Sequence, residues 1–222
     1  MNVLLVGSSS LAHALRERIA QREGVTLVDD DSGIAPEVVV AAEVHGGSVC
    51  ATLQRAAADY PAATLLGAAL TMSASEIAAT VKTSQFVGFA LLPPLNHRVE
   101  LMAAPQSSAA AMQRAEDFWR ALDLEPVAIG DSVAGVMPRV VCTLINEAAY
   151  ALQERVASEE DIDLAMQLGT NWPRGPLTWA NLIGLEEVDR ILRALQRIEG
   201  ERYAPSRVVS GLARRLEGFH ER

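Results

Sequence analysis

The stretch from Pro138 to Gly184 constrains the fold most, because its apolar residues recur with the period of a helix. Counted from Val141, they return after three, four, seven and eleven positions, at Leu144, Ile145, Ala148 and Leu152. This spacing predicts a long helix with one apolar face. Pro138 suits the first turn of that helix, where a missing N–H group costs nothing.

Signals for two more helices follow in the same stretch. Ser158, with Asp161 three residues later, predicts the start of a second helix, and Gly169 predicts its end. Pro176 and Gly184 bracket a third helix. Helices of this kind must pack on one another to bury their apolar faces, so an all-helical domain is predicted in the C-terminal part of the chain.

The N-terminal part alternates between strand and helix patterns. An apolar run at residues 2–6 leads into Gly-Ser-Ser-Ser and then into a helix with an apolar face. A second apolar run at residues 25–28 ends in three successive aspartates, which begin about 20 residues after Gly7. Strand, glycine turn, helix, strand and acid is the plan of a dinucleotide-binding βαβ unit.

In such a unit the pyrophosphate lies at the helix N-terminus, and an acid after the second strand binds the ribose hydroxyls. The candidate cofactor-binding residues are therefore Gly7, Ser9, Ser10, Leu11, Asp29 and Asp30. Ser9 stands where a second glycine normally lets bare backbone approach the pyrophosphate, and its Cβ intrudes there. Its hydroxyl could instead bind a phosphate, so NAD binding and a layer that binds nothing both stay open.

Further strand and helix patterns alternate up to about residue 132. Strands are predicted at 36–44, 63–70, 85–92, 99–103 and 125–132, and helices at 46–60, 73–81 and 107–123. Repeating βα units imply a parallel sheet covered on both faces. The predicted fold is α/β, with a Rossmann-like parallel sheet domain at 1–131 followed by an all-helical domain at 132–222.

Composition limits the compartment and the partners. The net charge of −9 argues against binding to nucleic acid or to an anionic membrane surface. Cys50 and Cys142 lie far apart with no CxxC pattern, as in reduced cytosolic proteins, and no metal site is predicted. The apolar run Val3 to Val6 is too short for a signal segment or a membrane span. A soluble cytoplasmic protein is expected.

Four phrases, LINEAAYAL, VASEEDIDLAMQLG, NWPRGPL and LIGLEEVDRIL, follow one another between about Asp131 and Leu212. In this order they closely resemble the helical C-terminal domain of short-chain L-3-hydroxyacyl-CoA dehydrogenases. The resemblance implies an NAD-dependent oxidoreductase of fatty-acid metabolism, an acyl-CoA-type ligand, and a homodimer formed through the helical domain. A short link after the second strand and a short C-terminal end imply a truncated and divergent member.

The family uses a histidine as the base that removes the hydroxyl proton, a glutamate that orients it, and serine and asparagine side chains that bind the substrate oxygen. The positions that match these polar groups hold Leu70 for the serine, Ala90 for the histidine, and Pro93 and Pro138 for asparagines. Glu100 most resembles the orienting glutamate. A methyl group cannot accept a proton, so no catalytic residue is assigned.

Three functions stay open. The substitutions favour a relative that is weakly active or non-catalytic. The alternatives are a working 3-hydroxyacyl-CoA dehydrogenase with a relocated base, and a different oxidoreductase that uses the same βαβ unit. His97, three residues before Glu100, is the best candidate for a relocated base, although an exposed loop histidine explains it as well. His45 lies at the end of a predicted strand and is a weaker candidate.

Overall fold

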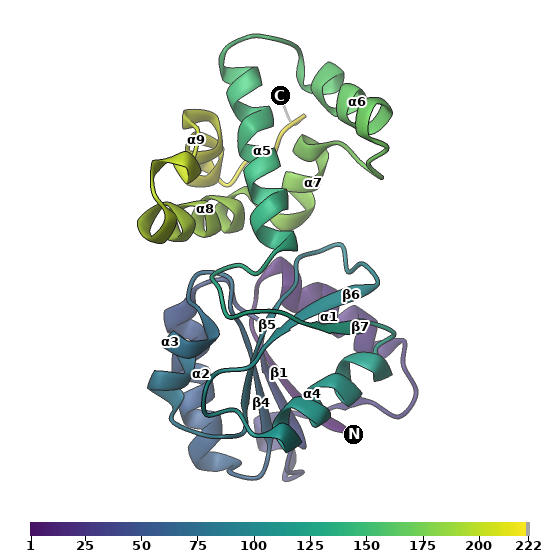
Figure 1. Cartoon of the computed structure of the whole chain (residues 1–222). Coiled ribbons are helices and arrows are strands. Elements are labelled where there is room, and N and C mark those ends of the chain that lie inside the picture. The colour runs from purple at the N-terminus through teal and green to yellow at the C-terminus, as the bar shows by residue number, and fades with distance from the viewer. Residues whose placement is uncertain (221–222) are drawn as a thin grey trace. The chain divides into compact units, whose positions relative to one another are not determined.

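The computed structural model describes residues 1–220 and divides into two compact units, Met1–Val136 and Met137–Arg222 (Figure 1). The first unit is a sheet covered by helices, and the second unit is helical. The predicted fold class, a Rossmann-like layer followed by an all-helical part, is confirmed. The sequence placed the boundary after residue 131, a few residues before the division seen here.

Within the described residues, the first unit contains a seven-stranded sheet in the order β2-β1-β3-β4-β5-β6-β7. The strands are β1 (Asn2–Val6), β2 (Thr26–Leu27), β3 (Val38–Ala41), β4 (Thr64–Ala68), β5 (Phe86–Ala90), β6 (Arg98–Met102) and β7 (Glu125–Ala128). All residues of β3, β4 and β5 are buried, as expected of central strands with helices on both faces.

One strand pair departs from the predicted parallel sheet. β6 runs antiparallel to β5, with Ala90 opposite Glu100, whereas β1 to β5 are parallel. A parallel return needs a crossover connection of about a dozen residues or more. Only residues 91–97 connect β5 to β6, so the chain has to turn back beside the strand that it has just left.

Four helices cover this sheet: α1 (Ser10–Ala20), α2 (Gly46–Asp59), α3 (Ala74–Val81) and α4 (Ala109–Ala121). Helices α2 and α3 pack on each other over β3 to β5, and α1 and α4 cover the other face (Figure 1). Serine caps start three of them: Ser9 for α1, Ser73 for α3 and Ser108 for α4. Each hydroxyl accepts a hydrogen bond from an N–H group of the first turn, which would otherwise lack a partner.

The second unit contains α5 (Met137–Gln153), α6 (Glu159–Thr170), α7 (Pro176–Ile183), α8 (Leu185–Glu199) and α9 (Arg207–Arg215). Helix α5 contacts each of the other four. The predicted apolar face of α5 is confirmed in part, because Val141, Ile145 and Ala148 are buried while Leu144 and Leu152 are half-buried. The starts predicted at Pro138, Ser158 and Pro176 also agree with the observed helices.

The sequence predicted that the second helix of this unit ends at Gly169, and this prediction is wrong for α6. The helix continues to Thr170, and Asn171 takes the left-handed conformation that terminates it, with φ of 53°. Asparagine tolerates this conformation better than other residues with a side chain, so it can replace glycine at a helix end.

The start of α7 depends on a side chain from α6. The buried carboxylate of Asp163 accepts hydrogen bonds from the backbone N–H groups of Leu177 and Thr178, at 2.8 and 2.9 Å. A Cβ on Gly175 would overlap this carboxylate, so the position has room only for glycine. The two helices are therefore joined by a buried charge-assisted contact.

Candidate functional site

Strand order reverses between β1 and β3, which lie side by side although β2 separates them in the chain. In open α/β sheets, ligands bind at such a switch point, beyond the carboxyl ends of the strands. The residues after β1 and β3 are therefore the candidate nucleotide site. The predicted cofactor-binding residues Gly7, Ser9, Ser10 and Leu11 all follow β1, at this edge.

Gly7 is required by the packing of the turn. Its φ is +145°, and a Cβ there would lie 2.7 Å from the carbonyl oxygen of Ala42, which directly follows β3. The glycine lets the two strand ends approach each other closely. This requirement belongs to the fold and holds whether or not a nucleotide binds.

Ser9 uses its hydroxyl within the protein. Oγ donates to the carbonyl oxygen of Ala42 at 2.5 Å and accepts from the N–H of Ala12 at 3.1 Å. A hydroxyl has one proton to donate, so Ser9 has none left for a phosphate while it bonds to Ala42. Ser10 is the first residue of α1, and the Leu11 side chain is fully buried in the core of this unit.

Glu43 is a member of this site that sequence reasoning missed. Its Oε1 accepts a hydrogen bond from the N–H of Ser8, in the glycine turn, at 2.5 Å, and lies 3.3 Å from the Ser8 hydroxyl. The signal was an acid two residues beyond β3, at the edge of the sheet where ligands bind. The Glu43 carboxylate therefore already accepts from the Ser8 N–H group, in the turn that leads into α1.

These contacts do not fit a dinucleotide bound in the usual way. The pyrophosphate needs backbone donors at the helix N-terminus and close approach to bare backbone. Here a serine side chain stands at the second glycine position, and the Glu43 carboxylate brings a negative charge to the turn. Like charges repel at such range.

The two aspartates predicted to bind ribose lie just after β2. Asp30 accepts hydrogen bonds from Arg55 Nη2 at 2.9 Å and from the Tyr60 hydroxyl at 3.1 Å. Loss of hydration and the neighbouring Asp30 raise the pKa of Tyr60. Asp29 is exposed and precedes a short 3-10 turn, Asp30–Ser32. Of the two acids, Asp30 is thus already engaged by groups of the chain.

The position aligned with the family's histidine lies beside the predicted glutamate. Ala90 ends β5 and is paired with Glu100 of the antiparallel β6. Ala90 is 2% exposed, and the backbone at Gly135 packs against its methyl group and against the Glu100 carboxylate. Oε2 of Glu100 accepts a hydrogen bond from the N–H of Val136 at 2.7 Å. The sequence alignment therefore brought together two residues that are neighbours across the sheet.

The other positions aligned with substrate-binding groups are apolar and buried. Leu70 and Pro93 lie just after β4 and β5, and Pro138 lies in the first turn of α5. Thr71, the only hydroxyl beside Leu70 in sequence, donates to the carbonyl oxygen of Val44 at 2.7 Å and accepts from the N–H of Gly46 at 2.9 Å. Its hydroxyl thus connects two loops of the sheet edge.

Among residues 1–220, neither candidate histidine is hydrogen-bonded to an acid that could orient it as a base. His97 is exposed in the link before β6, and its carbonyl oxygen accepts from the N–H of Glu125. His45 is the N-cap of α2, where Nδ1 accepts from the N–H of Ser48 at 3.3 Å. The predicted strand-end position of His45 is a helix cap instead.

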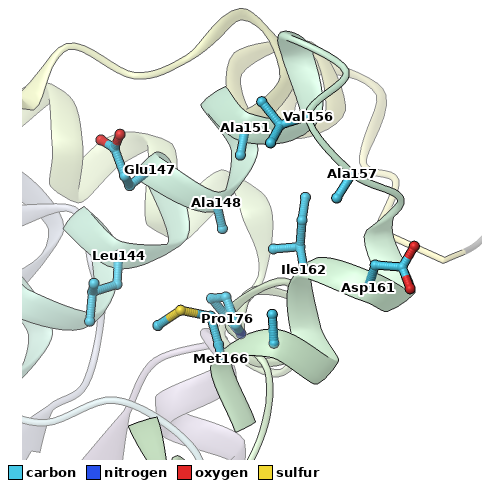
Figure 2. A pocket seen from close by; sticks show the side chains of 11 residues that line it. Leu144, Glu147, Ala148, Ala151, Val156, Ala157, Asp161, Ile162, Met166 and Pro176 are labelled. Atoms are coloured by element: carbon cyan, nitrogen blue, oxygen red, sulfur yellow. The ribbon is translucent and has the colours of Figure 1, made fainter. Parts of the chain in front are cut away.

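A separate apolar groove lies in the helical unit, among α5, α6, α7 and the link between α5 and α6 (Figure 2). Its volume is about 310 Å³. Ala148 and Ile162 face each other across it, while the carboxylates of Glu147 and Asp161 point away from its centre. The other residues that line it are Leu144, Ala151, Val156, Ala157, Ala165, Met166 and Pro176.

Among residues 1–220, no group of three or more histidine, cysteine or acidic residues is placed to hold a metal ion. No helix in the same range combines the length and the apolar character that crossing a bilayer requires.

Residues 136–217 match the family model for the 3-hydroxyacyl-CoA dehydrogenase C-terminal domain. The 3-hydroxyadipyl-CoA dehydrogenase of Escherichia coli K12 is 37% identical over 122 residues, which are 54% of this chain and 26% of the relative. The 3-hydroxybutyryl-CoA dehydrogenase of Bradyrhizobium diazoefficiens is 33% identical over 131 residues, 58% of this chain and 45% of the relative. The chain thus spans about half or less of the length of these relatives.

Solved structures show the same fold over nearly the whole chain. The (S)-3-hydroxybutyryl-CoA dehydrogenase from Ralstonia eutropha superposes with a TM-score of 0.73 at 20% identity, covering 96% of this chain and 93% of that one. The 3-hydroxybutyryl-CoA dehydrogenase from Escherichia coli K12 gives the same score and identity, covering 96% of this chain and 56% of the other. Through residues 136–217 the chain is therefore similar to the 3-hydroxyacyl-CoA dehydrogenase C-terminal domain, and the solved structures show that the chain shares the fold of these dehydrogenases.

Proposed function

We propose that this chain is a non-catalytic, or at most weakly active, member of the 3-hydroxyacyl-CoA dehydrogenase family. The observation that carries the proposal is the pairing of Ala90 with Glu100. A dehydrogenation of this kind needs a base within hydrogen-bond reach of the substrate hydroxyl. The acid that would orient such a base is present, but a methyl group stands in the place of the imidazole.

The neighbouring positions support the same proposal. Leu70 and Pro93 offer no side-chain group that could bind a substrate oxygen, and the hydroxyl of Thr71 bonds to Val44 and Gly46. Buried polar groups that recognise a substrate are expensive to replace by apolar ones when turnover depends on them. The loss of several groups at one edge of the sheet is the pattern expected of a chain that keeps the scaffold for another purpose.

The cofactor is part of the proposal. The family resemblance implies NAD, whose nicotinamide accepts the hydride when it is bound. In this chain the contacts of Ser9 and Glu43 do not fit the pyrophosphate. We therefore propose that the wild-type chain binds NAD weakly or not at all.

The test measures turnover of acetoacetyl-CoA with NADH, and the decrease in NADH absorbance reports the rate. We expect a rate equal to that of the uncatalysed control or only slightly above it. A rate within the range of about 1–10³ s⁻¹ that is typical of enzymes would refute the proposal. Calorimetric titration with acetoacetyl-CoA in the same buffer asks separately whether an acyl-CoA-type ligand binds without turnover.

The alternative function is a working 3-hydroxyacyl-CoA dehydrogenase with a relocated base. Its support is the helical-domain match together with His97, which directly precedes β6 and lies three residues before Glu100 in sequence. Should wild type prove active, His97→Ala decides between two cases. Loss of activity in that variant assigns the base to His97, and unchanged activity excludes this histidine.

A two-fold homodimer through the helical unit is the proposed assembly. Leu164 and Leu168 lie one helical turn apart on α6 and are 51% and 78% exposed. Val156, at the rim of the groove, is 71% exposed. Clustered exposed apolar side chains mark interaction surfaces, and a two-fold interface uses the same surface on both copies.

Sedimentation velocity at micromolar concentration tests this assembly. We expect a dimer for wild type and a shift towards monomer for Leu168→Glu, because a carboxylate would be buried at the interface. Ile34→Glu, at a 51% exposed position of the first unit, is the matched control and stays dimeric. A monomeric wild type contradicts the proposal.

A cytoplasmic location remains proposed as well. Cys50 and Cys142 are buried and form no disulfide bond, which suits a reducing compartment. Fractionation of cells that express the full chain would test it, and recovery with secreted proteins would refute it.

A further inference from the structure

The carboxylate of Glu43 accepts a hydrogen bond from a backbone N–H group of the turn where the family binds a nucleotide. Glu43 follows β3, and its Oε1 lies 2.5 Å from the backbone nitrogen of Ser8, which follows β1. The bond joins the two strand ends at the point where the strand order reverses. Glu43 is half-buried, so its charge is only partly screened by water.

Other donors at this edge of the sheet are also used within the unit. The N–H of Gly46, at the start of α2, bonds to Thr71 at 2.9 Å. The N–H groups of Ala74 and Ser75, at the start of α3, bond to the carboxylate of Asp131 at 2.7 and 3.0 Å. Helix N-termini attract anions because their N–H groups lack partners, and here the protein supplies its own acceptors.

A bound pyrophosphate would have to lie beside the Glu43 carboxylate. Two negative charges a few ångströms apart in a partly buried site weaken binding by orders of magnitude. The charge at position 43, more than the shape of the turn, would then decide whether a nucleotide binds. The Ser9 hydroxyl cannot offset it, because its proton is donated to Ala42.

We infer that Glu43 acts as an internal anion that blocks the candidate nucleotide site of this chain, and that removal of its charge lets this site bind a pyrophosphate-containing ligand. This role of Glu43 rests on the proposed function and gives the proposed weak NAD binding a cause that is separate from the missing base at Ala90. Glu43 affects nucleotide binding, whereas the alanine at position 90 affects proton transfer.

The experiment measures NADH fluorescence enhancement and ADP-ribose calorimetry on the full chain. Glu43→Gln keeps an amide oxygen that can accept from Ser8 and removes the charge. Glu43→Ala removes both the charge and the acceptor. Glu37→Gln is the matched control, because Glu37 accepts from the backbone N–H of Asn2 at 2.8 Å, at the opposite end of β3 and β1.

We expect Glu43→Gln to bind NADH and ADP-ribose at least about tenfold more tightly than wild type, with Glu37→Gln unchanged. Glu43→Ala keeps the conclusion testable if the first variant folds poorly, which thermal unfolding reports. Equal or weaker binding by both folded Glu43 variants overturns the inference, and so does an equal gain in Glu37→Gln.

The same samples separate this inference from the proposed function. Wild type that binds NADH as tightly as Glu43→Gln but turns over no acetoacetyl-CoA overturns the inference and leaves the proposed lack of catalysis standing. Wild type that turns over substrate at a rate typical of enzymes overturns the proposed function. Glu43→Gln that gains NADH binding without turnover supports both, because Ala90 is unchanged in it.

Discussion

Replacing Ser9 by alanine asks whether its hydroxyl serves the fold or a ligand. The change removes the N-cap of α1, which typically costs about 0.5–2 kcal/mol. It also leaves the buried carbonyl oxygen of Ala42 without the donor that lies 2.5 Å away, which costs about 1–3 kcal/mol. Ser9 is only 7% exposed, so water cannot easily replace the lost bond. We expect the variant to lose about 2–4 kcal/mol of stability.

Ser108→Ala is the matched control. Ser108 caps α4 by accepting from the N–H of Ala111 at 3.1 Å, the same distance as the cap bond at Ser9. It is half-buried, and the cap is the hydrogen bond that its hydroxyl makes. The control should therefore lose about 1 kcal/mol, and the difference between the two variants measures the bond from Ser9 to Ala42.

Urea unfolding followed by tryptophan fluorescence provides the measurement. Trp119 belongs to the first unit, whereas Trp172 and Trp179 belong to the second, so a background with phenylalanine at the latter two reports the first unit alone. Equal losses for Ser9→Ala and Ser108→Ala would refute the reasoning. Weaker NADH binding by Ser9→Ala than by wild type would show that the hydroxyl serves a nucleotide instead.

Three further predictions concern the helical unit. Asp163→Ala should lose about 2–4 kcal/mol in urea unfolding, because two N–H groups of α7 lose their acceptor. Gly175→Ala should cost a similar amount by displacing the Asp163 side chain, and the double variant should be less stable than Asp163→Ala, because the Cβ that remains at position 163 would still lie 2.2 Å from a Cβ at position 175. Burial, and then the charge of Glu187, raise the pKa of Cys142. Its thiol should therefore resist alkylation in the native chain at pH 8. The stability that the buried, neutral thiol contributes should be complete below the ordinary thiol pKa and should be lost as the pH rises beyond that value.

Local patterns predicted most of the elements. The turn at Gly7, the helix starts at Ser73 and Ser158, and the apolar face of α5 all depend on neighbours within a few residues. Periodicity and capping are properties of such short segments, so the sequence carries them directly. The end of α6 was misplaced because both glycine and asparagine can take the left-handed conformation there, and the sequence offers each.

The site was predicted only in part. The alignment put Ala90 at the place of the base and Glu100 at the place of its orienting acid, and the antiparallel pairing of β5 and β6 brings these two side by side. Glu43 was missed, since its position after β3 indicates the ligand-binding edge of the sheet but does not indicate a bond to Ser8. That bond exists because β3 returns to lie beside β1.

The sequence by itself therefore determined which segments are helices or strands and which polar side chains the chain no longer has. Tertiary structure decided which donors and acceptors meet: Glu43 with Ser8, Asp131 with the start of α3, and Asp163 with the start of α7. The physical reason is that a hydrogen bond requires approach within about 3 Å. For residues far apart in the chain, only strand order and helix packing bring the atoms that close.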